Sequence, residues 1–217
     1  KVRGPLSSNV TLMRSNTELK RQLGEAQLII TELEELRREN RRLSQLLTLT
    51  VPQGYTRTSA RVVGRSVTNL YQTLRISVGV ESGIQPGAPV VSGQGLVGQV
   101  LESSLFSSTI LLITDANSGV AVLSADNRSN GVIKGTGEVY LMMDYVAGSD
   151  LLESGEEVVT SGLGGVFPKG LPVGIVTSVT PDPVTHVKTA TVLPYTDFSN
   201  LEEVSVLLPE AGGESSE

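Results

Sequence analysis

The stretch GEEVVTSGLGGVFPKGLPVGIV, residues 155–176, places short apolar runs on either side of a loop rich in glycine and proline. An earlier stretch, GAPVVSGQGLVGQV at residues 87–100, has the same plan with a shorter loop. Short apolar runs bounded by turn residues are typical of β-strands. The repeat therefore predicts two related β-domains.

The glycines and prolines of the second copy are expected to determine the fold rather than to bind a ligand. Glycine adopts positive φ without steric cost and permits a very close backbone contact, and proline fixes φ. This structural loop comprises Gly162, Gly164, Gly165, Pro168, Gly170, Pro172 and Gly174.

The rest of the region after Pro52 has the same character. About a dozen apolar runs alternate with clusters of Gly, Pro, Asn and Asp, the spacing of an all-β sandwich or barrel. Short strands joined by tight turns are expected to close into small barrels, because closure removes exposed edges. The sequence predicts a mainly β fold, with an N-terminal coiled-coil helix followed by two small six-stranded-type β-barrels.

The expected domains are a dimerising coiled-coil helix at residues 1–51, a first barrel at 52–108, a second barrel at 109–187 and a disordered acidic tail at 209–217. The boundary between the barrels stays open at this stage, because strands from residues 188–208 could return to complete the first barrel.

The helix prediction rests on apolar residues that step by three and four from Leu12 to Leu47, the seam of a coiled coil. Two successive steps of three near Leu36 indicate one stammer. Because an isolated helix cannot bury such a seam, we expect a parallel homodimer. The seam comprises Leu19, Leu23, Ala26, Ile30, Leu33, Leu36, Asn40, Leu43 and Leu47.

Composition excludes several function classes. The formal net charge is −6 and only 4% of residues are aromatic, so nucleic acid is an unexpected partner. Cysteine is absent, which excludes disulfides and thiolate metal sites. No apolar run is long enough to cross a membrane. Because the chain starts at Lys1, close to the coiled coil, we expect a membrane anchor to precede it.

Three motifs suggest chemistry, and none has the context it needs. Gly93–Gly98 matches the dinucleotide fingerprint, which works only between a strand and a helix. Asp126–Gly131 begins like a calcium loop but carries Arg128 at a ligand position. His186 is the only histidine, and no serine after it lies in a glycine-flanked nucleophile turn. We expect no catalytic residues, no cofactor and no metal.

Four blocks of the β region resemble the MreC family, the rod shape-determining proteins of bacteria. They are GQGLVGQV at 93–100, LLITDANSGV at 111–120, NGVIKG at 130–135 and VVTSGLGGVFPKGLPVGIV at 158–176. The last block is long and ordered, so it is specific. The single transmembrane helix and short cytoplasmic tail of the family are not in this sequence.

The resemblance implies a non-catalytic scaffold of the wall-elongation machinery, anchored in the bacterial inner membrane with this part on the periplasmic side. Implied partners are further copies of the chain, the elongation-specific penicillin-binding transpeptidase, RodA, MreD and MreB. Aromatic and Met residues are enriched at interface cores. We therefore take as candidate partner contacts Tyr140, Met142, Tyr145 and Phe167.

Two other classes combine similar parts. A periplasmic adaptor of an export complex also joins coiled coil to small β-domains, but its strands should precede its helices, and no strand precedes the helix here. A two-barrel serine protease would need His186 as its general base, with acid and nucleophile in a suitable order. The sequence favours the scaffold.

Overall fold

The structure is a computed structural model that describes residues 20–24, 27, 31, 51–67, 71–181 and 187–210. By contacts the chain divides into two units, residues 1–44 and 45–217, and each is considered by itself. Within the first unit the described residues are helical. No helix among the described residues is long and apolar enough to cross a membrane.

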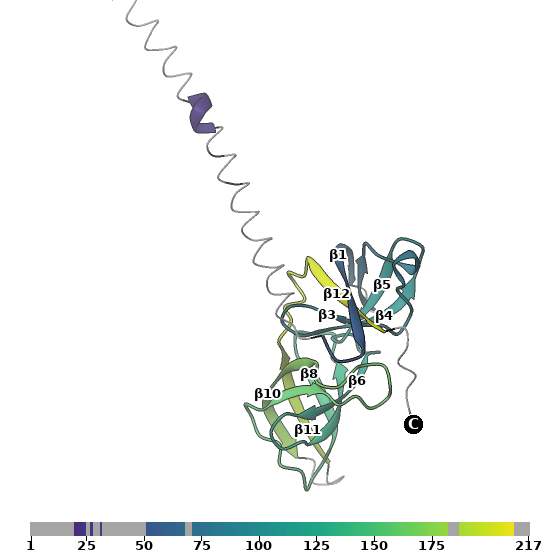
Figure 1. Cartoon of the computed structure of the whole chain (residues 1–217). Coiled ribbons are helices and arrows are strands. Elements are labelled where there is room, and N and C mark those ends of the chain that lie inside the picture. The colour runs from purple at the N-terminus through teal and green to yellow at the C-terminus, as the bar shows by residue number, and fades with distance from the viewer. Residues whose placement is uncertain are drawn as a thin grey trace, which may run out of the picture. The chain divides into compact units, whose positions relative to one another are not determined.

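The second unit holds two closed barrels of six strands each (Figure 1). The first contains β1 (Tyr55–Val67), β2 (Gln72–Ile76), β3 (Pro89–Val91), β4 (Leu96–Ser103), β5 (Ser108–Leu112) and β12 (Glu203–Pro209), with the 3₁₀ turn η1 (Val80–Ser82) between β2 and β3. The second contains β6 (Gly119–Ser124), β7 (Asn130–Gly135), β8 (Leu141–Ala147), β9 (Glu157–Thr160), β10 (Pro172–Pro181) and β11 (Val187–Pro194).

The last strand closes the first barrel. β12 pairs antiparallel with β1 from Tyr55↔Pro209 to Arg61↔Glu203, and its other edge pairs with β3. Figure 1 shows this yellow strand lying beside β1 and β3. β11, by contrast, pairs with β8 and β10 in the second barrel. Residues 188–208 are therefore divided between the barrels.

The expected boundary at residue 108 is wrong. β5 begins at Ser108 and pairs with β2 and β4, so the first barrel continues to Leu112. The second barrel begins with β6 at Gly119 and ends with β11 at Pro194. The apolar run at residues 109–114 predicts a strand, but its pattern cannot show which barrel the strand joins, since that depends on pairing between distant segments.

Strands at the junction of the barrels are apolar on both faces because each face meets a different core. In β12, Val204 and Val206 point into the first barrel, whereas Leu207 packs in a cluster shared with the second barrel. In β3, Val90 and Val91 divide in the same way. Strands buried on both faces read as continuous apolar runs rather than as alternating ones.

Polar contacts also join the barrels. Gln72 of β2 donates from its backbone N–H to Asp115 Oδ2 at 2.5 Å and from its side chain to the Gly137 carbonyl at 2.6 Å, in the β7–β8 turn. Thr196 hydrogen-bonds Ser92 Oγ at 3.1 Å and the Leu96 carbonyl at 3.1 Å. Asp115, Ser92 and Thr196 are buried, where an unmade hydrogen bond costs about 1–3 kcal/mol. These bonds fix the barrels against each other.

Candidate partner-binding face

Four large side chains are exposed along β8 and the turn before it: Val139 (67% exposed), Tyr140 (47%), Met142 (45%) and Tyr145 (68%). We call these four residues the β8 face. Leu141 and Met143 alternate with them and are fully buried, as expected of a strand with one face in a barrel. Tyr140 and Met142, two residues apart, therefore point to the same outer side. Exposed apolar groups gathered in this way indicate an interaction site.

A β-bulge places Tyr145 on this face. The partners of Met143 and Val146 on β11 are Ala190 and Lys188, so Asp144 and Tyr145 together stand opposite Thr189. Tyr145 has φ 63°, in the left-handed region that L-residues rarely adopt. Such a residue costs on the order of 1 kcal/mol or more relative to an unstrained one. The ring is thus held outward at an energetic cost.

Lys134 of β7 connects the charged and aromatic parts of this surface. Its Nζ lies 3.1 Å from Asp144 Oδ2 and 5.0 Å from the centroid of the Tyr145 ring. The hydrogen bond with Asp144 raises the pKa of Lys134. Lys134 also pairs with Met142 across the ladder. One cation therefore positions Asp144 and Tyr145 beside Met142.

The turn that carries Val139 and Tyr140 is held at both of its ends. Thr136 Oγ1 donates to the Tyr140 carbonyl at 2.6 Å, and the Gly137 carbonyl accepts from Gln72 of the first barrel. Gly137 N–H donates in turn to the Thr114 carbonyl at 2.9 Å. These hydrogen bonds hold the turn in place, so less conformational entropy is lost when a partner binds the β8 face.

Phe167 is not on this surface, and the expectation that it contacts a partner is wrong. It is 6% exposed and belongs to the core cluster of the second barrel. The loop that contains it turns through positive φ at Gly162, Gly164, Gly165 and Gly170, which brings Phe167 inward and leaves Leu163 exposed. The ring is a core residue because burying it removes a large apolar area from water.

The remaining members of the structural loop lie at tight contacts. A Cβ on Gly174 would lie 2.3 Å from the Leu193 carbonyl oxygen, and Thr160 Oγ1 donates to the Pro168 carbonyl at 2.5 Å. Pro172 begins β10, and its carbonyl oxygen would be 2.7 Å from a Cβ on Gly95. Of the predicted dimerisation seam, Leu23 is described and is 63% exposed in its helix. The other seam residues lie outside the described residues.

The motifs that suggest chemistry have other places in the fold. Gly93–Gly98 spans the β3–β4 hairpin, where Ser92 Oγ accepts the N–H groups of Gln94 and Gly95, and a strand follows it. Arg128, φ 60°, is in the β6–β7 turn. His186 lies outside the described residues. Among the described residues, no group of three His, Cys, Asp or Glu could hold a metal.

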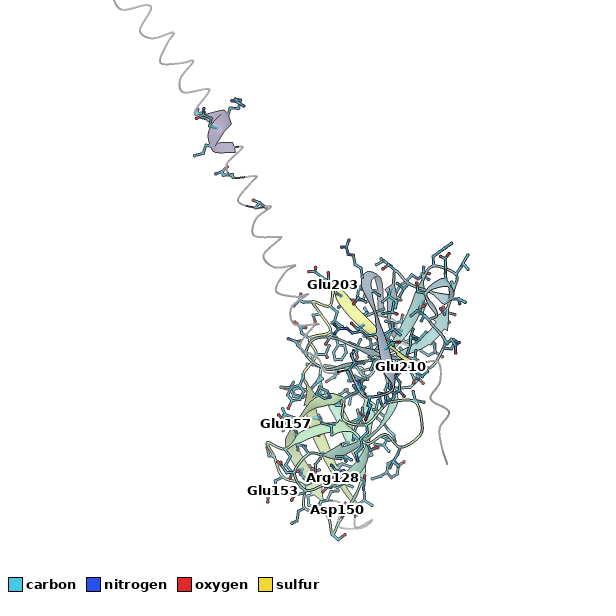
Figure 2. All side chains as sticks on the ribbon, in the orientation of Figure 1. Arg128, Asp150, Glu153, Glu157, Glu203 and Glu210 are labelled. Carbon is cyan, nitrogen blue, oxygen red and sulfur yellow. The ribbon has the colours of Figure 1, made fainter. Side chains whose placement is uncertain are left out.

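One buried carboxylate supports the turns at the end of the second barrel. Glu156 is 5% exposed, and its Oε1 accepts from Asn127 Nδ2 and from the Glu153 N–H, both at 2.8 Å. Burial opposes the charged form, but these hydrogen bonds prevail and hold the pKa of Glu156 below its ordinary value. Figure 2 shows Glu153 and Asp150 near Arg128 at this end. Glu156 Oε1 thus anchors both turns, whereas Oε2 is buried without a hydrogen-bond partner among the described residues.

Comparison with known proteins decides the family. The model of "Rod shape-determining protein MreC, barrel core" matches residues 62–208. The chain belongs to the MreC family. Export adaptors and two-barrel proteases are different families. Both barrels fall within the matched region except for the start of β1 and Pro209.

Curated MreC proteins from several bacteria resemble the chain. It is 36% identical to that of Caulobacter vibrioides over 73% of this chain and 46% of the relative, and 29% identical to that of Listeria monocytogenes over 95% and 73%. The chain thus spans about half to three quarters of these MreC proteins. They are described as cell shape-determining.

Solved MreC structures share the fold. One from Listeria monocytogenes has a TM-score of 0.68 and 29% identity, covering 94% of this chain and 100% of its own. Another, described as the major periplasmic domain of the cell shape-determining filament MreC, has a TM-score of 0.66 and 22% identity, and the match covers 74% of this chain and 99% of that one. A third is a complex between penicillin-binding protein 2 and MreC from Helicobacter pylori, with a TM-score of 0.59 and 22% identity; the match covers 72% of this chain and 99% of that one.

Sequence reasoning found three members of the β8 face and missed Val139, together with Lys134 and Asp144 beside it. One signal was available. Asp144-Tyr145 separates the buried Met143 and Val146, so apolar positions three apart interrupt a period of two. Such an interruption predicts a bulge with two adjacent side chains outside the barrel.

Proposed function

We propose that this MreC chain is a non-catalytic scaffold of wall elongation that docks the elongation-specific penicillin-binding transpeptidase on its β8 face. The observation that carries the proposal is the exposed aromatic and Met surface held by the strained bulge at Tyr145. The Helicobacter pylori complex supports the choice of partner class, since there an MreC binds a penicillin-binding protein.

The chemistry of the β8 face suits a protein partner. Tyr and Met are enriched at interface cores, and a Tyr ring loses little conformational entropy on binding. Full burial of a Met side chain contributes about 1.5–3 kcal/mol. Lys134 and Asp144 at the margin satisfy each other and would set the orientation of a partner more than the affinity. An apolar centre with a charged rim is the usual anatomy of an interface.

Self-association and membrane attachment belong to the same proposal. The seam from Leu19 to Leu47 would pair two chains in parallel, so that one assembly presents two β8 faces. The description of a related MreC as a filament supports assembly beyond a dimer, and its periplasmic domain supports the same side of the inner membrane for this chain. RodA, MreD and MreB are further proposed partners at that membrane.

The experiment is a calorimetric titration of the chain with the periplasmic domain of the elongation transpeptidase from the same bacterium. The double variant Met142→Glu, Tyr145→Glu places two charges in the interface and should weaken binding at least about 30-fold, the equivalent of a 2 kcal/mol hot spot. Leu105→Glu, Phe106→Glu is the matched control, since both side chains are exposed in the β4–β5 turn of the first barrel.

The proposal predicts tight binding for the chain and the control, and weak binding for the β8 variant. Peptidase and wall-hydrolase assays of the purified chain should show no turnover. Equal affinity of the β8 variant and the chain, or turnover abolished by His186→Ala, would overturn it.

A further inference from the structure

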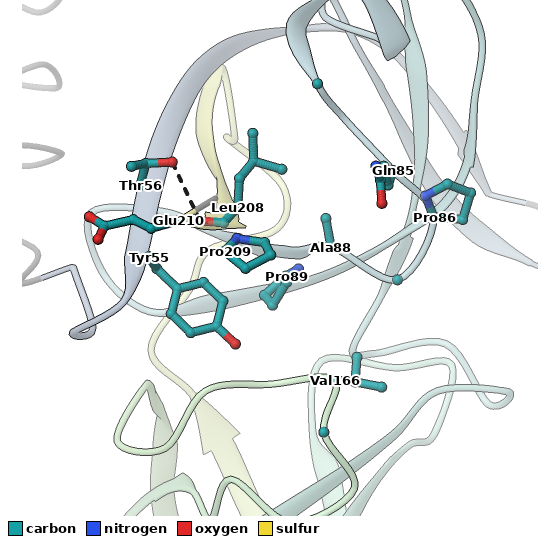
Figure 3. Close-up of a pocket in the computed structure, with 13 residues that line it drawn as sticks. Tyr55, Thr56, Gln85, Pro86, Ala88, Pro89, Val166, Leu208, Pro209 and Glu210 are labelled. Atoms are coloured by element: carbon teal, nitrogen blue, oxygen red, sulfur yellow. Dashed lines mark hydrogen bonds between the residues drawn. The ribbon is translucent and has the colours of Figure 1, made fainter. Parts of the chain in front are cut away.

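A groove of about 610 Å³ lies between the first barrel and the glycine-rich loop of the second. Figure 3 shows Tyr55, Pro89 and Pro209 along one side and Val166 on the other. Its volume is that of a site for a small molecule or a short peptide segment. It contains none of the residues of the β8 face.

The groove exists because β12 extends beyond its partner on one edge. β3 pairs with β12 only at Ser205 and Val206, whereas β1 pairs with β12 as far as Pro209. Leu208 and Pro209, at the end of β12 that does not pair with β3, line the groove. A free strand edge ordinarily invites another strand.

Prolines prevent strand addition here. Pro86, Pro89 and Pro209 line the groove and have no N–H to donate. The N–H groups of two further lining residues are already used: Gly87 donates to the Val100 carbonyl at 2.7 Å, and Glu210 donates to the Gly54 carbonyl at 2.9 Å. These five residues therefore offer no N–H group to a backbone ladder, which favours an occupant recognised through its side chains and carbonyl groups.

The remaining lining chemistry selects the occupant. Tyr55, Val166 and the prolines offer apolar ridges, and the Tyr55 hydroxyl, which Figure 3 shows directed into the opening, and the Gln85 amide can donate to carbonyl groups. A polyproline II segment has free carbonyl groups and docks on grooves lined by aromatic residues. Among the described residues that line the groove, only Glu210 is charged, so a neighbouring cation is favoured.

We propose that this groove binds a proline-containing segment of a partner protein in a polyproline II conformation, with a Lys or Arg placed against Glu210. Residues 211–217 are a poor occupant, because AGGESSE offers no large apolar side chain and repeats the negative charge of Glu210. The prolines disfavour a strand inserted by a second copy.

The test is fluorescence anisotropy of the full chain with two labelled probe peptides, Ala-Pro-Pro-Leu-Pro-Arg-Ala and the same sequence with Glu in place of Arg. The chain should bind the Arg peptide saturably, with a Kd below about 1 mM, and prefer it to the Glu peptide. Glu210→Lys should reduce affinity for the Arg peptide about fivefold or more and reverse the preference. Glu210 is exposed at the end of β12, so folding should be retained.

Val166→Asp should weaken both peptides at least about tenfold, whereas Leu163→Asp, exposed on the same loop but outside the groove, should change neither. Melting temperatures identify any variant that fails to fold. If Val166→Asp does not fold, the result for Glu210→Lys tests the proposal by itself. No saturable binding up to about 1 mM, or a preference indifferent to Glu210→Lys, overturns the proposal. A tenfold gain on removal of residues 211–217, or on dilution of the chain, would also overturn it, since the tail or a second copy would then fill the groove.

Discussion

Replacing Tyr145 by glycine removes the backbone strain of the bulge and the exposed ring together, so that stability and partner binding can be measured separately. Tyr145 occupies the left-handed region at φ 63° and is 68% exposed, so its ring contributes little burial. Glycine adopts this conformation without steric cost. If the strain is maintained for docking, Tyr145→Gly should leave the barrel intact and remove the central aromatic contact.

The magnitude follows from two opposing terms. Release of a non-glycine residue from the left-handed region gains about 1–2 kcal/mol, and the larger entropy of an unfolded glycine costs about 0.5–1 kcal/mol. Loss of the exposed contact with Lys134 offsets part of the remainder. The free energy of unfolding should therefore be unchanged or rise by up to about 1 kcal/mol, a shift of about 2–4 °C in Tm for a domain of this size.

Two measurements on one preparation check this expectation. Thermal denaturation should show a Tm equal to or above that of the parent chain, and calorimetry should show transpeptidase binding weakened at least about 30-fold. Phe106→Gly is the control, since Phe106 is 65% exposed in a turn of the first barrel and should leave binding unchanged. A fall in Tm of more than about 6 °C would show that the ring holds the bulge, and unchanged binding would show that the bulge serves no partner; either result refutes the reasoning.

Further perturbations probe the loop, the buried carboxylate and the helix. Gly174→Val, whose Cβ would meet the Leu193 carbonyl oxygen, should lower the free energy of unfolding by at least about 2 kcal/mol in chemical denaturation, and Gly164→Val, at φ 89°, by at least about 1 kcal/mol. The control Gly119→Val places its Cβ in open space and should be nearly neutral. If Gly164→Val is stable but loses partner binding, the loop is a recognition site instead. Because folding lowers the pKa of Glu156, the carboxylate stabilises the fold above about pH 4.5, and this stabilisation is lost as the pH falls through the folded pKa. Glu156→Gln should therefore lessen the fall in Tm on acidification. The same dependence of Tm on pH in the variant and the parent chain would contradict this. Leu23→Glu with Leu43→Glu should sediment as a monomer with folded barrels, because burying each Leu is worth about 1.5–3 kcal/mol, and a persistent dimer would disprove the seam.

Local pattern was sufficient for most strands because each strand carries its own period. The alternation at Leu74 and Ile76 predicts β2, and the runs at 157–160 and 204–208 predict β9 and β12 closely. The sequence pattern predicts a strand at 139–143, whereas β8 spans Leu141–Ala147, since the bulge at Asp144-Tyr145 shifts Val146 out of phase. A period of two cannot follow a strand through an inserted residue.

The pairing of distant strands that closes each barrel, and the burial of residues within loops, could not be predicted from the sequence. β5 reads as an isolated strand, and only its pairing with β2 and β4 assigns it to the first barrel. Phe167 lies among glycines and prolines that indicate an exposed loop, yet positive φ at several of those glycines brings the ring into the core. The groove combines residues near 55, 85, 166 and 209, segments that become neighbours only after both barrels close.

Hydrogen–deuterium exchange of the chain, with and without the transpeptidase's periplasmic domain, tests the docking of a wall-synthesis enzyme on the β8 face most directly. Docking on that face should slow exchange in peptides that cover residues 132–147, the ladder of β7 and β8 with the turn between them. Peptides from the β4–β5 turn around Phe106 should exchange at the same rate in both samples. Protection confined to the first barrel, or no protection in a sample where calorimetry shows the complex has formed, would contradict the account.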